Sequence, residues 1–205
     1  MNLKELVEQA YKEGCSNIYC GVTGAGKTPK VREQVHEFQM PNQVVYDPNY
    51  EQEPNYEWMK EGNYPYEKWT VYHNWHKILN DIRAKKIKAA HLVLEDASVE
   101  LAGMADTDIK SMLIAIEHCN NIGHYVFHGL MDVPPIFFRQ SHFLYLFKTG
   151  DFEDNVKSSR KEFYEIFKTI RKNPDPHIWA CVHLRERDLE GNYIVTYGSG
   201  FTMYE

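Results

Sequence analysis

The chain has 205 residues, with 23 basic and 29 acidic side chains and a net charge of −6. This length suits one domain with at most a small extension, and the charge excludes a polycation that coats nucleic acid, so any DNA contact needs a local patch or an assembled pore. The four cysteines form no C-x-x-C pair, and no run approaches the ~18 apolar residues of a membrane span, so we expect a cytoplasmic protein without a zinc site.

The first predicted element is an amphipathic helix over residues 1–14, in which apolar residues recur at helical spacing. A short buried strand over Asn17–Cys20 follows it. This strand leads into a segment that matches the Walker A pattern G-x-x-x-x-G-K-[ST] at every fixed position, namely Gly21-Val22-Thr23-Gly24-Ala25-Gly26-Lys27-Thr28. Val31 and Val35 then recur at helical spacing, which predicts a helix whose positive N-terminal end faces bound phosphates.

The chemistry of this loop predicts a nucleotide-binding protein. Its glycines let backbone N–H groups turn toward phosphate oxygens, the Lys27 ammonium reaches the β and γ phosphates, and the Thr28 hydroxyl is a ligand for Mg²⁺. ATP and Mg²⁺ are therefore the expected cofactors. The alternative is a chance match, and the strand before the loop and the helix after it argue against one.

A second strand is predicted over Gln43–Asp47 and is stopped by the proline that follows. Asp47 belongs either to the nucleotide crevice or to a turn before that proline. Residues 48–66 are rich in Tyr, Glu, Asn and Pro without clear periodicity, which indicates a functional or binding insertion. A short strand over Thr70–Tyr72 and a helix over residues 75–82 are predicted next.

The segment Leu92-Val93-Leu94-Glu95-Asp96 has the form of a Walker B strand. A buried strand that ends in two carboxylates supplies what a Mg-nucleotide site needs, one acid for the Mg²⁺ shell and one to orient and activate water. We favour Glu95 near Mg²⁺ and Asp96 near water, and the reverse assignment stays open. Two adjacent acids favour hydrolysis over phosphoryl transfer by a nucleotide kinase, which needs an acceptor site and lid arginines.

Three further polar residues are candidates for the site. His128 follows an apolar strand and is a candidate sensor of the γ-phosphate, with a core or loop histidine as the alternative. Arg139 is a candidate for a guanidinium that enters a neighbouring subunit's nucleotide site and stabilises transition-state charge, with a surface arginine as the alternative. Lys148 follows the next apolar strand, Phe143–Phe147, and is a second cationic candidate.

The remaining elements are two helices and a hairpin. A helix is expected around Ile109–Ile116, and one long last helix around residues 157–172 with its apolar face at Phe163–Ile170. Residues 176–198 read as a C-terminal β-hairpin. Strands that alternate with helices predict an α/β fold with a mainly parallel sheet, helices on both faces, and active groups at the carboxyl ends of the strands.

Four segments together resemble the FtsK–HerA superfamily of P-loop ATPases, and within it the small genome-packaging ATPases of tailless, membrane-containing icosahedral viruses. They are Gly21–Thr28, Val44–Pro48, Leu92–Asp96 and the sensor-strand segment Asn121–Pro134, continued by Arg139 and by Leu146–Asp151. The resemblance covers roughly residues 15–190, and the sensor-strand segment is the discriminating one.

This resemblance implies a single P-loop NTPase domain, residues 1–205, of the RecA/ASCE class, whose five-stranded core places the phosphate-loop strand beside the sensor strand. It implies a ring, with a hexamer as the expected size, that binds nucleotide between subunits and drives DNA through a central pore by hydrolysing ATP. The expected partners are DNA, further copies of the chain, and a capsid or membrane vertex protein, in the host cytoplasm or the virion.

The chain departs from the family at three places. His128 stands where Gln is usual, and Asn120 and Asn121 stand where an arginine often precedes the sensor strand. The usual order of the acid pair, Asp then Glu, is reversed at Glu95 and Asp96. These departures leave the arginine finger and the water-activating acid to be assigned.

Three other functions stay open on the sequence. A motor of the same superfamily that acts on protein in phage assembly or secretion would usually carry a membrane span. A nucleotide kinase would carry an Arg-rich lid, whereas residues 48–66 are acidic and aromatic. A nucleotide-gated binding module without turnover is compatible with the reversed acids and the missing arginine.

Overall fold

A computed structural model of the chain describes residue 11 and residues 14–49, 68–96 and 98–200. Most of the predicted N-terminal helix, and the predicted insertion from residue 50 onward, lie outside the described residues. In the part that is described, no helix is long and apolar enough to cross a bilayer.

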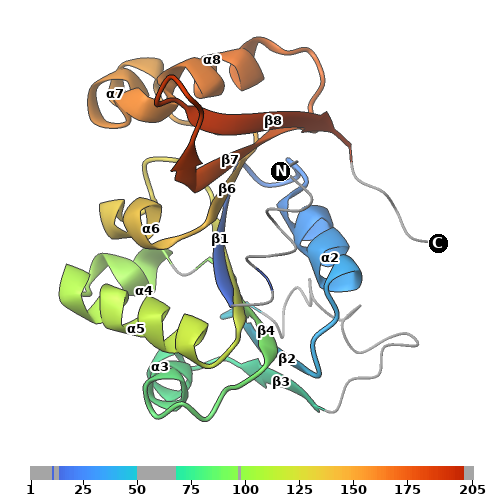
Figure 1. Cartoon of the computed structure of the whole chain (residues 1–205), viewed down its shortest axis with the longest axis vertical. Coiled ribbons are helices and arrows are strands. Elements are labelled where there is room, and N and C mark those ends of the chain that lie inside the picture. The colour runs from blue at the N-terminus through green and yellow to red at the C-terminus, as the bar shows by residue number, and fades with distance from the viewer. Residues whose placement is uncertain (1–10, 12–13, 50–67, 97, 201–205) are drawn as a thin grey trace.

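The described strands form one sheet (Figure 1). Its parallel strands are β1 (Cys15–Cys20), β2 (Asn42–Tyr46), β3 (Lys68–Tyr72), β4 (Ala90–Leu94), β5 (Ile122–Phe127) and β6 (Phe143–Leu146). An antiparallel hairpin of β7 (Ile178–Arg187) and β8 (Tyr193–Ser199) extends the sheet beyond β6. The order is β3-β2-β4-β5-β1-β6-β7-β8, so the phosphate-loop strand lies between the sensor strand and β6. The predicted mainly parallel sheet, its C-terminal hairpin and the β1–β5 pairing are thus confirmed.

Helices cover both faces of the sheet, as predicted (Figure 1). They are α2 (Lys27–Glu37), α3 (Trp75–Arg83), α4 (Ser98–Ala102), α5 (Asp106–His118), α6 (Pro135–Gln140), α7 (Glu153–Ser159), the 3₁₀ turn η2 (Lys161–Phe163) and α8 (Tyr164–Lys172). The helix α2 packs on one face, and α3, α5, α6 and α8 pack on the other.

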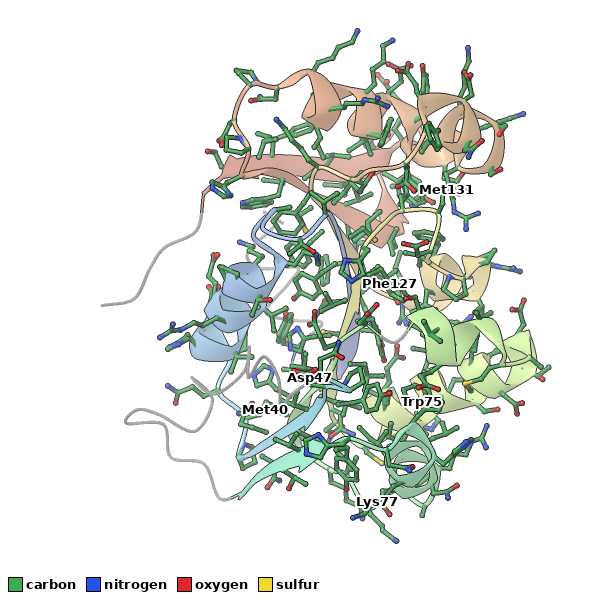
Figure 2. All side chains as sticks on the ribbon, turned by 180° about the vertical axis from the view of Figure 1, so that it is seen from behind. Met40, Asp47, Trp75, Lys77, Phe127 and Met131 are labelled. Carbon is green, nitrogen blue, oxygen red and sulfur yellow. The ribbon has the colours of Figure 1, made fainter. Side chains whose placement is uncertain are left out.

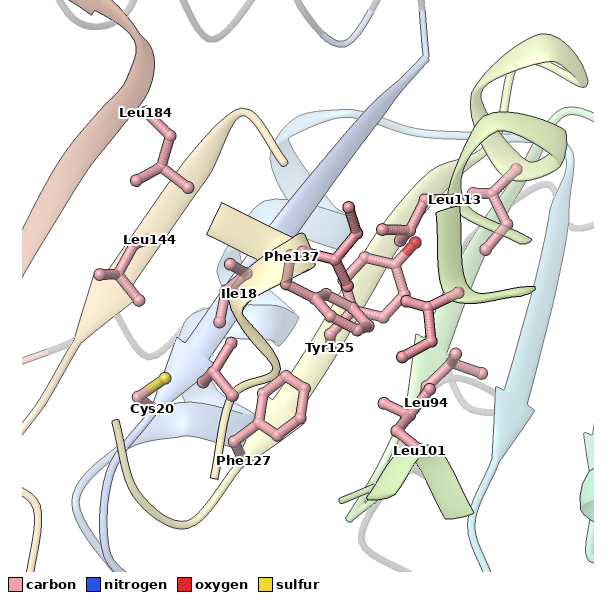
Figure 3. Close-up of a cluster of buried hydrophobic side chains, with 14 of the residues drawn as sticks. Ile18, Cys20, Leu94, Leu101, Leu113, Tyr125, Phe127, Phe137, Leu144 and Leu184 are labelled. Atoms are coloured by element: carbon pink, nitrogen blue, oxygen red, sulfur yellow. The ribbon is translucent and has the colours of Figure 1, made fainter. Parts of the chain in front are cut away.

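Alternate residues of each strand enter one of two apolar cores. Ile18 and Cys20 of β1 face the helices α5 and α6, together with Tyr125 and Phe127 of β5, as Figure 3 shows. Tyr19 of β1 points the other way, toward α2. Burial on both faces explains why these strands read as continuous apolar runs in the sequence.

The prediction of one long last helix was wrong. The segment forms α7, η2 and α8, because Arg160 leaves the helical conformation at φ −136° and ψ 48°. Its guanidinium donates to the carbonyl oxygen of Val133 at 2.8 Å. The short helices α4 and α6 were also not predicted, because five and six residues are too few to display a helical period.

Two fully buried histidines on neighbouring strands form a polar chain beneath α2. The carbonyl of Phe38, just after α2, can only accept, so His91 donates to it from Nε2. His91 Nδ1 then accepts from His124 Nε2 at 2.9 Å, and His124 Nδ1 accepts from the Tyr19 hydroxyl at 2.9 Å. This pattern requires both imidazoles to be neutral, and burial lowers the pKa of His91 to about 4 and that of His124 well below its usual range.

We expect these histidines to make the fold acid-sensitive. Between pH 6.5 and about 4, His91 is protonated in the unfolded chain but stays neutral in the native chain. The free energy of unfolding therefore falls as the pH falls, by about 2 kcal/mol at pH 5 for this residue alone. Urea unfolding at pH 7.5 and pH 5 measures this loss. It should be smaller in His91→Gln and unchanged in the control His76→Gln, whose side chain is exposed on α3. Equal losses in all three proteins would contradict the assignment.

Candidate active site

The phosphate loop is fixed by the strand ends on either side of β1. The N–H of Gly21 donates to the carbonyl of Phe127 at the end of β5, at 3.2 Å, and the N–H of Val22 donates to the carbonyl of Lys148 beyond β6, at 2.9 Å. Gly24 and Gly26 adopt φ of 79° and 105°, which only glycine adopts without strain. The sequence pattern therefore forms a pre-shaped loop that ends at the first residue of α2.

Lys27 is already placed inside this loop. Its side-chain Nζ donates to the carbonyls of Gly21 at 2.6 Å and Val22 at 3.1 Å, and the residue is 6% exposed. Burial lowers the pKa of the Lys27 ammonium, and the nearby Glu95 carboxylate opposes that shift. The loop carbonyls therefore hold the cation at the edge of the cavity that Lys27 helps to line.

The acid pair lies across from the phosphate loop at the same edge of the sheet. The N–H of Glu95 continues the β4–β2 pairing by donating to the carbonyl of Tyr46 at 2.9 Å. Asp96 then turns away from the sheet at φ 46° and accepts a hydrogen bond from the Ser98 hydroxyl at 3.1 Å. Asp96 thus leaves the strand geometry that Glu95 continues, while both residues line the same cavity.

A cavity of about 290 Å³ joins these groups at the carboxyl ends of the parallel strands. Its lining brings together residues from the phosphate loop, from the acid pair and from the ends of β2 and β5, namely Thr23, Gly24, Gly26, Lys27, Thr28, Pro29, Asp47, Asn49, Glu95, Asp96 and His128. Glycine N–H groups, a lysine, a threonine hydroxyl and acids are the donor set that a Mg-nucleotide requires, so the residues present fit ATP and Mg²⁺.

His128 and Asp96 form a pair in this cavity. The His128 Nε2 lies 3.5 Å from the Asp96 Oδ1, and half of the histidine side chain is exposed. Of the two alternatives for His128, the geometry favours a residue of the site over a core histidine. Of the two acids, Asp96 is the one that His128 approaches.

Asp47 combines both of its predicted roles. It lines the cavity from the end of β2, and its Oδ1 accepts the N–H of Asn49 at 2.9 Å, which makes the turn after the strand. Figure 2 labels Asp47 in this position. Asn49 is a cavity residue that sequence reasoning missed, because no spacing rule relates it to the Walker segments.

The two cationic candidates lie outside the cavity. Arg139 is exposed in the last turn of α6, which leads back toward the amino end of the sheet, where the N–H of His142 donates to the carbonyl of Ser16. Lys148 donates from Nζ to the carbonyl of Asn173 at 2.6 Å. Neither side chain lines the site of its own chain.

No protein-family model and no curated protein sequence matches the chain. Several solved structures, in contrast, match the chain. The genome-packaging NTPase B204 of Sulfolobus turreted icosahedral virus 2, in complex with sulfate, is 14% identical with a TM-score of 0.69, and the match covers 94% of this chain and 99% of B204. B204 has also been solved with the nucleotide analogues ATP-γS and AMPPCP.

Two larger proteins share the same fold. The pCW3 conjugation coupling protein TcpA, with ATP-γS, is 11% identical with a TM-score of 0.52, and the match covers 91% of this chain and 60% of TcpA. EccC of Thermomonospora curvata (ATPases 2 and 3), with a signal sequence peptide, is 9% identical with a TM-score of 0.50, and the match covers 94% of this chain and 38% of EccC. The chain therefore shares its fold with B204 and with TcpA, and the predicted P-loop NTPase fold is confirmed.

Proposed function

We propose that this chain is an ATP-hydrolysing motor that translocates DNA and packages a viral genome into a capsid. The observation that carries the proposal is the single cavity in which the phosphate loop, the acid pair and His128 meet, on a fold shared along nearly its whole length with a genome-packaging NTPase. DNA as the track and the capsid as the destination come from that likeness.

The side chains divide the work of hydrolysis between them. The N–H groups of the phosphate loop and the Lys27 ammonium bind the β and γ phosphates and neutralise the charge that develops during bond cleavage. Asp96 orients the attacking water and accepts its proton. His128, whose Nε2 lies 3.5 Å from the Asp96 Oδ1, contacts the γ-phosphate and signals its loss to the loop that follows β5.

Thr28 and Glu95 would hold Mg²⁺. Glu95 ends β4 directly beside β2, and both residues line the cavity with Lys27. When bound, Mg²⁺ would supply positive charge that stabilises the negative charge of the phosphates. In the reversed acid order, the longer side chain, Glu95, would then serve the metal, and Asp96, on the turn at φ 46°, would serve the water.

The test is steady-state ATP hydrolysis by the purified chain, with and without double-stranded or single-stranded DNA, alongside its mass in solution with nucleotide. DNA-stimulated turnover by a ring-sized species, with a hexamer expected, supports the motor and identifies its track. A monomer that binds ATP and ignores DNA would contradict DNA translocation by the isolated chain.

A second function is an assembly or nucleotide-gated ATPase that acts on protein. The specific observation in its favour is EccC, which shares the fold and was solved with a signal sequence peptide. Turnover that is insensitive to both forms of DNA but stimulated by a capsid or membrane vertex protein would favour it. A nucleotide kinase predicts transfer of phosphate to a nucleoside monophosphate, which is detected as formation of the diphosphate when that acceptor is added to the assay.

Arg139 is expected to act in a neighbouring subunit, because it is exposed and lies away from the cavity of its own chain. Arg139→Ala should lower turnover by about 10³-fold if it serves as the arginine finger, with ATP affinity retained. Mixing Arg139→Ala subunits with Lys27→Ala subunits should then restore part of the activity, since some interfaces combine one intact Lys27 with one intact Arg139. Mixtures no more active than their parts would remove this role from Arg139.

A further inference from the structure

We propose that Asp151 is a positioning residue, which holds His128 against Asp96 through the backbone of the sensor loop. The sensor loop is residues 128–133, between β5 and α6. This proposal rests on the function proposed above and adds to it a residue that lies outside the nucleotide cavity.

Both carboxylate oxygens of Asp151 accept hydrogen bonds from the backbone of the sensor loop. Its Oδ2 accepts the N–H of Leu130 at 2.7 Å, and its Oδ1 accepts the N–H of Met131 at 3.4 Å. Hydrogen bonds to a charged acceptor are stronger than those between neutral groups. Figure 2 labels Met131 in this loop, beyond Phe127 at the end of β5.

The Asp151 carboxylate lies close to the backbone beside a glycine, Gly129. A Cβ on Gly129 would lie 2.9 Å from the Asp151 Oδ1 and 3.0 Å from the Asp132 Oδ2. The residue next to the sensor histidine is therefore one whose missing side chain makes room for the carboxylate.

His128 lies between two backbone anchors. On one side, the carbonyl of Phe127 accepts the N–H of Gly21 in the phosphate loop, and on the other side the N–H of Leu130 is held by Asp151. The histidine ring itself is half exposed and sits 3.5 Å from the Asp96 oxygen. Packing does not fix such a ring, so its distance from Asp96 depends on where the two anchors hold the backbone.

The anchor also connects the sensor loop to the C-terminal helices. Arg160, between α7 and η2, donates to the carbonyl of Val133 at 2.8 Å, and Arg171 of α8 donates to the main-chain carbonyl of Asp151 at 3.4 Å. A change at the γ-phosphate that moves His128 would therefore be transmitted through these hydrogen bonds to the segment that contains α7 and α8. These contacts connect the site to the C-terminal helices without involving α2.

The test compares Asp151→Asn with Asp154→Asn, a matched control that makes the same change on the exposed first turn of α7. Asparagine keeps the size of the side chain and one acceptor oxygen, so the fold is retained while the hydrogen bonds to the sensor loop weaken. We expect Asp151→Asn to lower kcat by about tenfold, because small misplacements of catalytic groups carry large rate costs, with KM and the affinity for a fluorescent ATP analogue within about twofold of wild type. In a His128→Ala background the same change should alter kcat by less than about twofold, because residues that act through one another are not additive.

A second readout does not depend on turnover. The imidazole ¹⁵N signals of His128 should shift in Asp151→Asn, and the amide of Leu130 should exchange faster, while Asp154→Asn leaves both unchanged. The role of Asp151 would be overturned if Asp151→Asn lowered kcat as much in the His128→Ala background as in the wild-type chain. It would also be overturned if the His128 signals did not change. A wild-type chain that binds the ATP analogue without hydrolysing it would instead overturn the proposed function, and the histidine signals would still decide the role of Asp151.

Discussion

Replacing Lys27 with alanine is expected to reduce ATP turnover to background, a loss of at least ~10²-fold, and to weaken nucleotide binding. The ammonium is held at 2.6 Å and 3.1 Å by two carbonyls of the phosphate loop, so it is pre-positioned before any phosphate arrives. No other lysine lines the cavity in the described part of the chain. Alanine therefore removes the lysine ammonium that neutralises the charge on the transferred phosphoryl group. Steady-state hydrolysis measures the loss of turnover, and a fluorescent-nucleotide titration measures the loss of binding.

Lys30 offers a matched control on the same helix. It is also buried, but its Nζ pairs with Glu33 at 2.9 Å and lies 4.0 Å from the centre of the Trp179 ring, away from the cavity. Lys30→Met removes an equivalent charge from α2 and should lower thermal stability while turnover is retained. Unchanged hydrolysis in Lys27→Ala would show that the cavity described here is not the site of turnover.

Local patterns predicted the parts of the site that are contiguous in sequence. The phosphate loop and the acid pair each combine a strand, a turn and a fixed set of side chains in one short continuous segment, so their spacing carries the geometry directly. Strand alternation with helices predicted the parallel sheet for the same reason. The β1–β5 pairing was implied by the family resemblance and not by any spacing in the chain.

The long-range contacts were beyond local patterns. Asp151 holds Leu130 across 21 residues, and Arg160 reaches Val133 across 27, so no window of the sequence contains both partners. The break between α7 and α8 was missed because the apolar period continues through Phe163, while the turn is set by the contact that Arg160 makes. The pairing of His91 with His124 was likewise not predicted, because it forms only once β4 and β5 are neighbours.

Asp96→Asn is expected to retain ATP binding and to lose hydrolysis by about 10²- to 10⁴-fold, the usual contribution of a general base. The Asp96 backbone has φ 46°, a conformation that asparagine also tolerates, and the amide oxygen can still accept from Ser98, so the turn should survive the substitution. Only the proton-accepting charge beside His128 is removed. Binding of a fluorescent ATP analogue and single-turnover hydrolysis separate the two effects.

Glu95→Gln is the informative comparison, because it removes the other charge of the pair from a different place. Glu95 is the carboxylate with the larger electrostatic effect on Lys27, and its backbone extends the β4–β2 pairing, so its loss should weaken Mg-nucleotide binding before it slows the chemical step. Raising the Mg²⁺ concentration should rescue part of the Glu95→Gln defect and none of the Asp96→Asn defect. If Glu95→Gln instead binds ATP normally and fails only in hydrolysis, the two acids exchange roles, and the water lies on the Lys27 side of the cavity and not beside His128.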